Sequence, residues 1–215
     1  RGELRVNLLQ CRPLQTHHED RRVEIPDKIE QEDIFFKSRG NFMGGNFTRK
    51  VRKIVYVDPQ NYYNLKQREK HDIARMVGEL NRHLGKVVEE PFILIGPGRW
   101  GSSTPSLGIP VKFADINRAA VLMEVAFNPG NLIPELSFGT HFFQDLVEAE
   151  ILYVALFPDK EGSIFNRRYL QKLTNMVDLL LTKGEKYKNV LRLYDLGNNE
   201  LKIYSDIQAG EIIGF

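Results

Sequence analysis

The chain has 215 residues, of which 42% are hydrophobic and 27% charged, and its formal net charge is +2. This length suffices for one large domain or two small ones, and the near-neutral charge gives no general argument for a nucleic acid or an anionic membrane surface as partner. No apolar run approaches the ~20 residues that cross a bilayer, and the N-terminus lacks the apolar segment of a signal peptide. The single cysteine, Cys11, excludes an internal disulfide framework, so we expect a cytoplasmic protein.

Apolar and polar residues alternate at 4–9, LRVNLL, which predicts a strand that stops before Pro13. The chain starts inside this pattern and without methionine, so we expect a piece of a longer protein. Residues 15–32 are highly charged and poor in apolar side chains, which indicates a linker. The adjacent His17 and His18 in it suggest either a metal ligand pair or a solvated linker. Neighbouring positions do not easily face one site and no third ligand is near, which favours the linker.

Residues 33–38 and 51–57 predict strands on either side of a glycine-containing turn at 39–46, so we expect a broad hairpin-like unit. The basic run TRKVRKIV at 48–55 carries apolar residues at strand spacing. This spacing favours a solvated strand face over a phosphate-binding track.

The clearest helix is predicted at 66–84, where Gly85 marks the end and apolar residues recur at helical spacing: Ile73, Met76, Val77, Leu80 and Leu84. His71 and His83 lie off this apolar stripe, so we expect both to be exposed.

The rest of the chain alternates between the two element types. Strands are predicted at 91–95, 119–127 and 151–157, and a short helix at about 141–149. A second amphipathic helix is predicted at roughly 166–183, with one apolar face: Leu170, Leu173, Val177, Leu180 and Leu181. The C-terminal residues predict short strands joined by the turns GNN and AG. Mixed strands and helices, several with crossover lengths, predict an α/β fold.

The segment GPGRWGSST, residues 96–104, has the residue types of an anion-binding loop. Gly98 and its neighbouring glycines permit close backbone approach, and Arg99 offers a planar fork of donors. Three hydroxyl residues follow: Ser102, Ser103 and Thr104. The segment matches neither the P-loop nor the dinucleotide-binding glycine pattern. Its alternative interpretation is a structural loop with Trp100 packed on the core, and the residues alone leave both open.

The segment ELSFGTHFFQDL, residues 135–146, places His141 after Gly139-Thr140 and at the start of the predicted short helix. A helix N-terminus presents unpaired N–H groups and the positive end of a dipole, which suit an anion. A neutral imidazole there can attack phosphorus and form a phosphohistidine, and Thr140 can cap the helix or hold a phosphoryl oxygen. The alternative is a core histidine in a tight turn.

The third segment is LLQCRP, residues 8–13. Gln10 and Arg12 alternate on one face at the end of the predicted strand. Side chains of these types can reach a bound polyphosphate or its metal.

In this order, the three segments resemble parts of the phosphoenolpyruvate synthase and pyruvate phosphate dikinase family. Leu9-Gln10-Cys11-Arg12-Pro13 is similar to the L-Q-x-R-P strand that closes its ATP-grasp module. Successive segments are similar to its swivelling phosphohistidine domain: RGNFMGGNFTRKVRKIVYVDP, FILIGPGRWGSSTPSLGIP, AAVLMEV, FGTHFFQDLVEAEILYVAL and GNNELKIYSDIQAGEII. GPGRWGS, LGIPV and the GTHFFQDL pattern together also resemble the C-terminal region of PEP/pyruvate-binding-domain proteins, over about residues 33–157.

The resemblance implies an α/β organisation in which 1–14 is the last strand of a truncated ATP-grasp module, 15–32 a linker, and 33–215 a swivelling β/β/α phosphohistidine-like domain with a mixed sheet and flanking helices. It implies His141 as phosphoryl acceptor, Gln10 and Arg12 on the nucleotide, and phosphoryl-binding residues around the histidine: Gly98, Arg99, Ser102, Ser103, Thr104 and Thr140. ATP and Mg²⁺ would serve the full-length protein, with no cofactor and no metal site in this fragment. The implied partners are the ATP-grasp module of the same chain and a pyruvate-like phosphoryl acceptor, with neither nucleic acid nor membrane.

Three hypotheses remain open. The first is a phosphoryl-carrier domain, inactive as a fragment because the family's PEP/pyruvate barrel is missing. The second is a non-catalytic regulatory module that uses GPGRWGSS to hold an anion, and the third is a scaffold packed against the ATP-grasp module. Phe142 and Phe143 stand where the family has two alanines. Under the first hypothesis their rings shield a labile phosphoramidate from water; under the others they mark a histidine that does not react.

Overall fold

The computed structural model describes residues 23–26, 28–84, 90–127 and 141–215, with the side chain of His141 excepted. The strands in these ranges are β1 (Phe36–Arg39), β2 (Phe42–Met43), β3 (Phe47–Val51), β4 (Lys53–Val57), β5 (Phe92–Pro97), β6 (Arg99–Trp100), β7 (Gly108–Ile109), β8 (Val121–Val125), β9 (Leu152–Leu156), β10 (Ile164–Phe165), β11 (Leu191–Asp195), β12 (Leu201–Asp206) and β13 (Glu211–Gly214). The helices are α1 (Pro59–Tyr63), α2 (Gln67–Leu84), α3 (His141–Glu148), α4 (Arg167–Gln171), α5 (Val177–Leu180) and α6 (Gly184–Tyr187), with a 3₁₀ turn, η1, at Phe113–Asp115.

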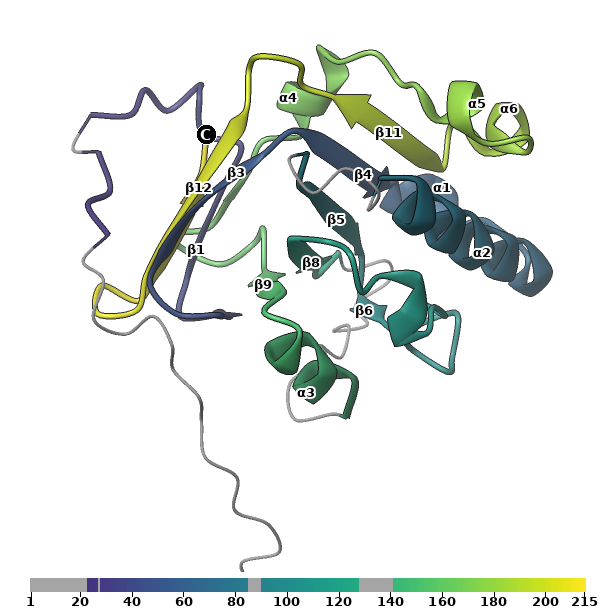
Figure 1. The fold of residues 1–215 in the computed structure, drawn as a ribbon, viewed down its shortest axis with the longest axis horizontal. Helices are drawn as coiled ribbons and strands as arrows, with labels where there is room; N and C mark the ends of the chain where they lie inside the picture. Colours follow the sequence, from purple (N-terminus) through teal and green to yellow (C-terminus); the bar gives the residue numbers. More distant parts are fainter. Residues whose placement is uncertain (1–22, 27, 85–89, 128–140) are drawn as a thin grey trace, which may run out of the picture.

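A mixed sheet forms the centre of the described structure, with the strand order β11-β4-β5-β8-β9-β2 (Figure 1). Strands β4, β5, β8 and β9 run parallel, while β11 and β2 pair antiparallel at the edges. Along the chain, β4, β5, β8 and β9 are added one after another in the same direction across the sheet. Because such crossovers are right-handed, the connecting helices lie on one face. The expected α/β class is therefore confirmed.

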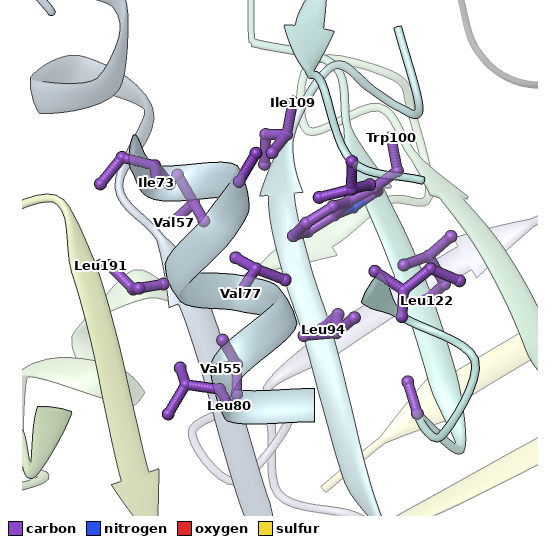
Figure 2. Packing of buried hydrophobic residues seen from close by; sticks show 14 of the residues in the cluster. Val55, Val57, Ile73, Val77, Leu80, Leu94, Trp100, Ile109, Leu122 and Leu191 are labelled. Atoms are coloured by element: carbon purple, nitrogen blue, oxygen red, sulfur yellow. The ribbon is translucent and has the colours of Figure 1, made fainter. Parts of the chain in front are cut away.

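Alternate residues of the central strands enter two different cores. Val55, Leu94 and Leu122 lie on the helical side, where Figure 2 shows them with Ile73 and Val77 of α2. Their sequence neighbours point the other way, into a core shared with the second sheet: Ile54, Ile93, Val121 and Met123. Helices, central sheet and second sheet thus form three layers. Burial of each such aliphatic side chain contributes roughly 1.5–3 kcal/mol.

The second sheet is antiparallel, with the order β10-β1-β13-β12-β3 in the described chain. The predicted hairpin of 33–38 with 51–57 is therefore wrong: β1 belongs to this sheet, whereas β4 belongs to the central one. The chain changes sheets at Arg52, the one residue between β3 and β4. Its N–H donates to Pro91 O at 2.9 Å and its carbonyl accepts from Leu196 N at 2.8 Å. Strand spacing alone does not reveal which partner a strand takes.

The basic run at 48–55 is paired with acidic residues, as a solvated strand face predicts. Thr48 and Lys50 of β3 are exposed. Glu200 accepts from Arg52 at 2.9 Å and from Lys50 at 3.1 Å, and Lys53 pairs with Asp195 at 3.3 Å and with Glu90.

Several local predictions are confirmed. The helix predicted at 66–84 is α2, with His71 and His83 exposed. The strands predicted at 91–95, 119–127 and 151–157 are β5, β8 and β9, and α3 begins at the predicted residue. Among the described helices, none combines the length and the apolar character needed to cross a membrane.

The single helix predicted at 166–183 is wrong, because the segment folds as α4 and α5 with an irregular stretch between them. Asn175 stabilises the irregular stretch. Its Oδ1 accepts hydrogen bonds from the N–H groups of Val177 (3.1 Å) and Leu193 (3.0 Å), and its Nδ2 donates to Lys188 O at 2.9 Å. Leu180, expected on the apolar face, is 42% exposed.

Candidate functional site

The loop that follows β5 folds back on itself. Arg99 N donates to Leu107 O at 3.1 Å and Gly101 N to Ile109 O at 2.9 Å, so β6 pairs with β7. Gly108 makes this approach possible, because a Cβ there would lie 1.8 Å from the carbonyl oxygen of Arg99. The glycines of the segment therefore serve close backbone packing.

Trp100 anchors the loop on the helical side of the central sheet (Figure 2). The ring is fully buried and its Nε1 donates to Met123 O at 3.1 Å. Gly96 leaves room for the ring, because a Cβ there would lie 2.7 Å from it. The interpretation that Trp100 packs on the core is thus confirmed.

The buried carboxylate of Glu124, on β8, supports the loop through hydrogen bonds. It has no exposed surface. Its Oε1 accepts from Trp100 N at 2.9 Å and its Oε2 from the Tyr153 hydroxyl at 2.7 Å. Charge-assisted bonds of this kind are needed to keep a carboxylate inside a protein. Glu124 was not predicted from the sequence, although a charged residue inside the apolar run AAVLMEVAF was the available signal.

A second hydrogen bond from the helical side fixes the loop. The buried Tyr62 hydroxyl of α1 donates to Gly108 O at 2.8 Å. Burial raises the pKa of Tyr62, because the phenolate would lose its hydration, so this hydroxyl remains a donor at neutral pH. The β6–β7 unit therefore has supports from both β8 and α1.

Helix α3 begins beside this loop. A Cβ on Gly101 would lie 2.8 Å from the ring of Phe142, so that ring packs against the backbone of the loop. Phe113 meets Phe142 edge-on at 6.5 Å, and Phe143 meets Tyr153 at 5.2 Å between ring centroids. Both phenylalanines after His141 thus have packing partners: Phe142 brings the first turn of α3 to Gly101 of the GPGRWGSST loop, and Phe143 packs on β9.

Among the described residues, the hydroxyl and guanidinium groups predicted to bind phosphate differ in their surroundings. Arg99 is half-buried, and its Nε is buried without a hydrogen-bond partner among the described residues. Ser102 Oγ donates to Thr104 O at 2.9 Å and accepts from Thr104 N at 3.1 Å, so this hydroxyl closes a local turn. The Ser103 and Thr104 side chains are exposed.

Several other predicted residues lie outside what the structure describes. Gln10, Arg12 and Thr140 are in undescribed ranges, and of His141 only the helical backbone position is described. In the described ranges, no group of three or more His, Cys, Asp or Glu side chains could hold a metal ion.

A second polar group, also missed from the sequence, lies where β4 ends. Asp58 is 5% exposed and its Oδ1 caps α1, accepting from Asn61 N at 3.0 Å. Its Oδ2 faces two guanidinium groups, Arg167 Nη2 at 3.3 Å and Arg192 Nη2 at 3.7 Å. The signal in the sequence was Asp58-Pro59, a capping residue followed by a proline suited to a first helical turn.

Comparison of the chain with protein-family models, with curated proteins and with solved structures finds no match.

Proposed function

We propose that the chain is a phosphoryl-carrier domain of a phosphotransferase similar to phosphoenolpyruvate synthase. His141 takes a phosphoryl group from an ATP-derived donor and passes it to pyruvate or a related acceptor. ATP and Mg²⁺ act at the ATP-grasp module of the full-length protein. The fold assignment behind the proposal is the swivelling β/β/α phosphohistidine-like domain, which the three described layers support.

One observation carries the proposal: Phe142, the residue after His141, packs on Gly101 of the GPGRW loop. The N-terminus of an eight-residue helix and a loop with a half-buried arginine are therefore neighbours. Backbone N–H groups and a guanidinium are the donors that stabilise charge on a transferring phosphoryl group. Ser102 supports the loop conformation, and Thr140 remains a proposed ligand of the phosphoryl oxygens.

The proposed transfer has two displacement steps. In the first, the unprotonated ring nitrogen of His141 attacks phosphorus, so an N–P bond forms while the P–O bond to the donor breaks. The departing oxygen keeps the electron pair, and the other ring nitrogen keeps its proton. In the second, an oxygen of the acceptor attacks phosphorus and the N–P bond breaks. The imidazole is thereby regenerated.

The test uses the full-length protein incubated with β- and γ-labelled ATP. We expect acid-labile label on the wild type and none on His141→Ala. His83→Ala is the matched control, because His83 is an exposed histidine at the far end of α2, and it should keep the wild-type label. Acid-labile label that survives in His141→Ala overturns the proposal.

A second candidate function is favoured by Arg99, whose Nε is buried without a described partner. An unpaired donor inside a closed loop suits a bound anion whether or not His141 reacts. If the chain is a non-catalytic regulatory module, His141→Ala should bind pyrophosphate with the wild-type Kd, and Arg99→Ala should not bind it. Arg82→Ala, an exposed arginine near the end of α2, is the control.

A further inference from the structure

A separate cavity of about 400 Å³ opens at the carboxyl edge of the central sheet. Most of its lining follows the ends of β4, β8 and β9, and Arg167 comes from the start of α4. Two prolines and an alanine complete the wall, and the other lining residues are Gln60, Tyr63, Phe127, Asp159 and Arg167. The outside of the carboxyl ends of parallel strands is where open α/β sheets bind ligands, and the volume falls within the range of small-molecule sites.

Arg167 is held at this cavity from two sides. Its Nη2 pairs with the buried carboxylate of Asp58 at 3.3 Å, and its guanidinium carbon lies 5.6 Å from the centroid of the Phe127 ring. The pair with Asp58 uses one nitrogen of the fork. The Arg167 side chain is 45% exposed, so part of its guanidinium is open to a ligand, and a carboxylate matches a guanidinium in planar geometry.

The charges that line the cavity balance, because Arg167 contributes one cation and Asp159 one anion. Asp159 is exposed and has no hydrogen-bond or ion-pair partner in the described part of the chain. A polyphosphate placed on Arg167 would meet this carboxylate and be repelled. A ligand that carries one negative and one positive group is complementary to both side chains.

Apart from Gln60, the remaining lining residues are aromatic, proline or alanine. Tyr63 and Phe127 present aromatic rings, and the prolines extend this surface. Lys70 supports Tyr63 from outside the lining, with its Nζ 5.7 Å from the centre of that ring. A cavity of this size and lining suits a large apolar or aromatic side chain better than a small one.

We infer that this cavity binds a zwitterionic α-amino acid with a large apolar side chain. The ligand carboxylate pairs with Arg167, its ammonium with Asp159, and its side chain lies against Tyr63 and Phe127. The inference goes beyond the proposed phosphoryl transfer and uses neither His141 nor the GPGRW loop.

The ligand test is calorimetric titration of the 215-residue chain with L-phenylalanine. Two analogues each remove one charge: 3-phenylpropionate lacks the ammonium and phenethylamine lacks the carboxylate. We expect each to bind about tenfold or more weakly than L-phenylalanine, since each leaves one charged partner unpaired. Equal binding of both analogues, ATP binding that requires Arg167, or no binding of L-phenylalanine at about 10 mM overturns the inference.

The variant test addresses the two charged side chains. Asp159→Asn and Arg167→Gln should each weaken L-phenylalanine binding by about tenfold or more. Glu161→Gln, an exposed acid on the same loop, and His141→Ala should bind as the wild type does. Arg167→Gln disturbs the pair with Asp58 and so bears on folding. Asp159 has no such partner in the described part of the chain, so Asp159→Asn tests the inference even if Arg167→Gln fails to fold. Wild-type binding by Asp159→Asn contradicts the inference.

Discussion

The carboxylate of Glu124 accepts a hydrogen bond of 2.9 Å from the backbone N–H of Trp100, and both residues are fully buried. This bond joins the third parallel strand of the central sheet to the centre of the candidate loop. The position of the loop therefore depends on a side chain that contacts the core and not the solvent.

Replacement of Glu124 by leucine should destabilise the protein. The N–H of Trp100 and the hydroxyl of Tyr153 would lose an acceptor in a buried place, at about 1–3 kcal/mol each. Glu124→Gln keeps one carbonyl oxygen and should lose less. The free energy of unfolding in urea measures both, with the exposed Glu79→Gln as control. A wild-type value for Glu124→Leu would show that the carboxylate is dispensable.

Replacement of Gly101 by alanine should separate the loop from α3. Gly101 has a φ of +77°, and its added Cβ would also lie 2.8 Å from the Phe142 ring. Gly197→Ala is the matched control, because Gly197 has a φ of +56° with nothing within 4 Å of an added Cβ.

Both variants should lose about 1–2 kcal/mol of unfolding free energy to backbone strain. Gly101→Ala should lose more, and the excess should shrink when Phe142→Ala is combined with it. Equal losses in the two single variants would mean that the ring moves aside without cost.

Tyr56 should make the unfolding free energy depend on alkaline pH. Burial raises the pKa of Tyr56 to about 12 from 10.0, with the nearby Arg167 acting in the opposite sense. The unfolded chain therefore loses this proton at lower pH than the folded chain. The stabilisation is complete below pH 10 and is lost as pH rises toward 12.

Tyr56→Phe should consequently lose less stability than the wild type between pH 10 and pH 12, by on the order of 2 kcal/mol. At pH 8 it should lie close to the wild type, because the phenol is protonated in both the folded and the unfolded chain and the substitution removes only its contact with the nearby Arg167. Urea unfolding at a series of pH values tests this. Parallel pH curves for the two proteins would be the contrary result.

Asn175→Ala should cost about 1–3 kcal/mol of unfolding free energy, since its amide makes three hydrogen bonds to backbone groups between α4 and β11. Thr174→Ala, at the exposed neighbouring position, should leave stability near the wild-type value. Helical circular dichroism should not rise in Asn175→Ala, because β11 still occupies the adjacent space. A gain in helix would indicate that Asn175 alone prevents the continuous helix.

The spacing of apolar residues predicted those helices and strands that are determined by their own stretch of sequence. Helix α2 carries its apolar stripe within one stretch, so it could be predicted from the sequence. The packing of Trp100 on the core was one of two interpretations that the residues left open. The pairing of β1 with β13 could not be predicted, because β13 lies far along the sequence, near the C-terminus. Asn175 has an ordinary helix-compatible neighbourhood in sequence. Its backbone partners at Lys188 and Leu193 become visible only when the chain is folded.

The candidate site follows the same division. The glycines and Arg99 of the loop were recognisable as residue types, whereas the local turn that occupies Ser102 and the supporting role of Glu124 arise from packing. The Arg167 cavity combines residues that follow four separate strands, β4, β8, β9 and β10, so no contiguous sequence motif predicts it.

The change of sheet at Arg52 has a consequence for the order in which the molecule can assemble. Strand β3 pairs with β12, and β4 pairs with β5 on one side and with β11 on the other, so each sheet needs residues more than a hundred positions later. During synthesis, neither sheet is complete until residues 191–214 have been made. Contacts so distant in sequence slow folding and leave β3 without its partner β12 until then. The C-terminal strands thus decide when the newly made chain becomes a folded protein.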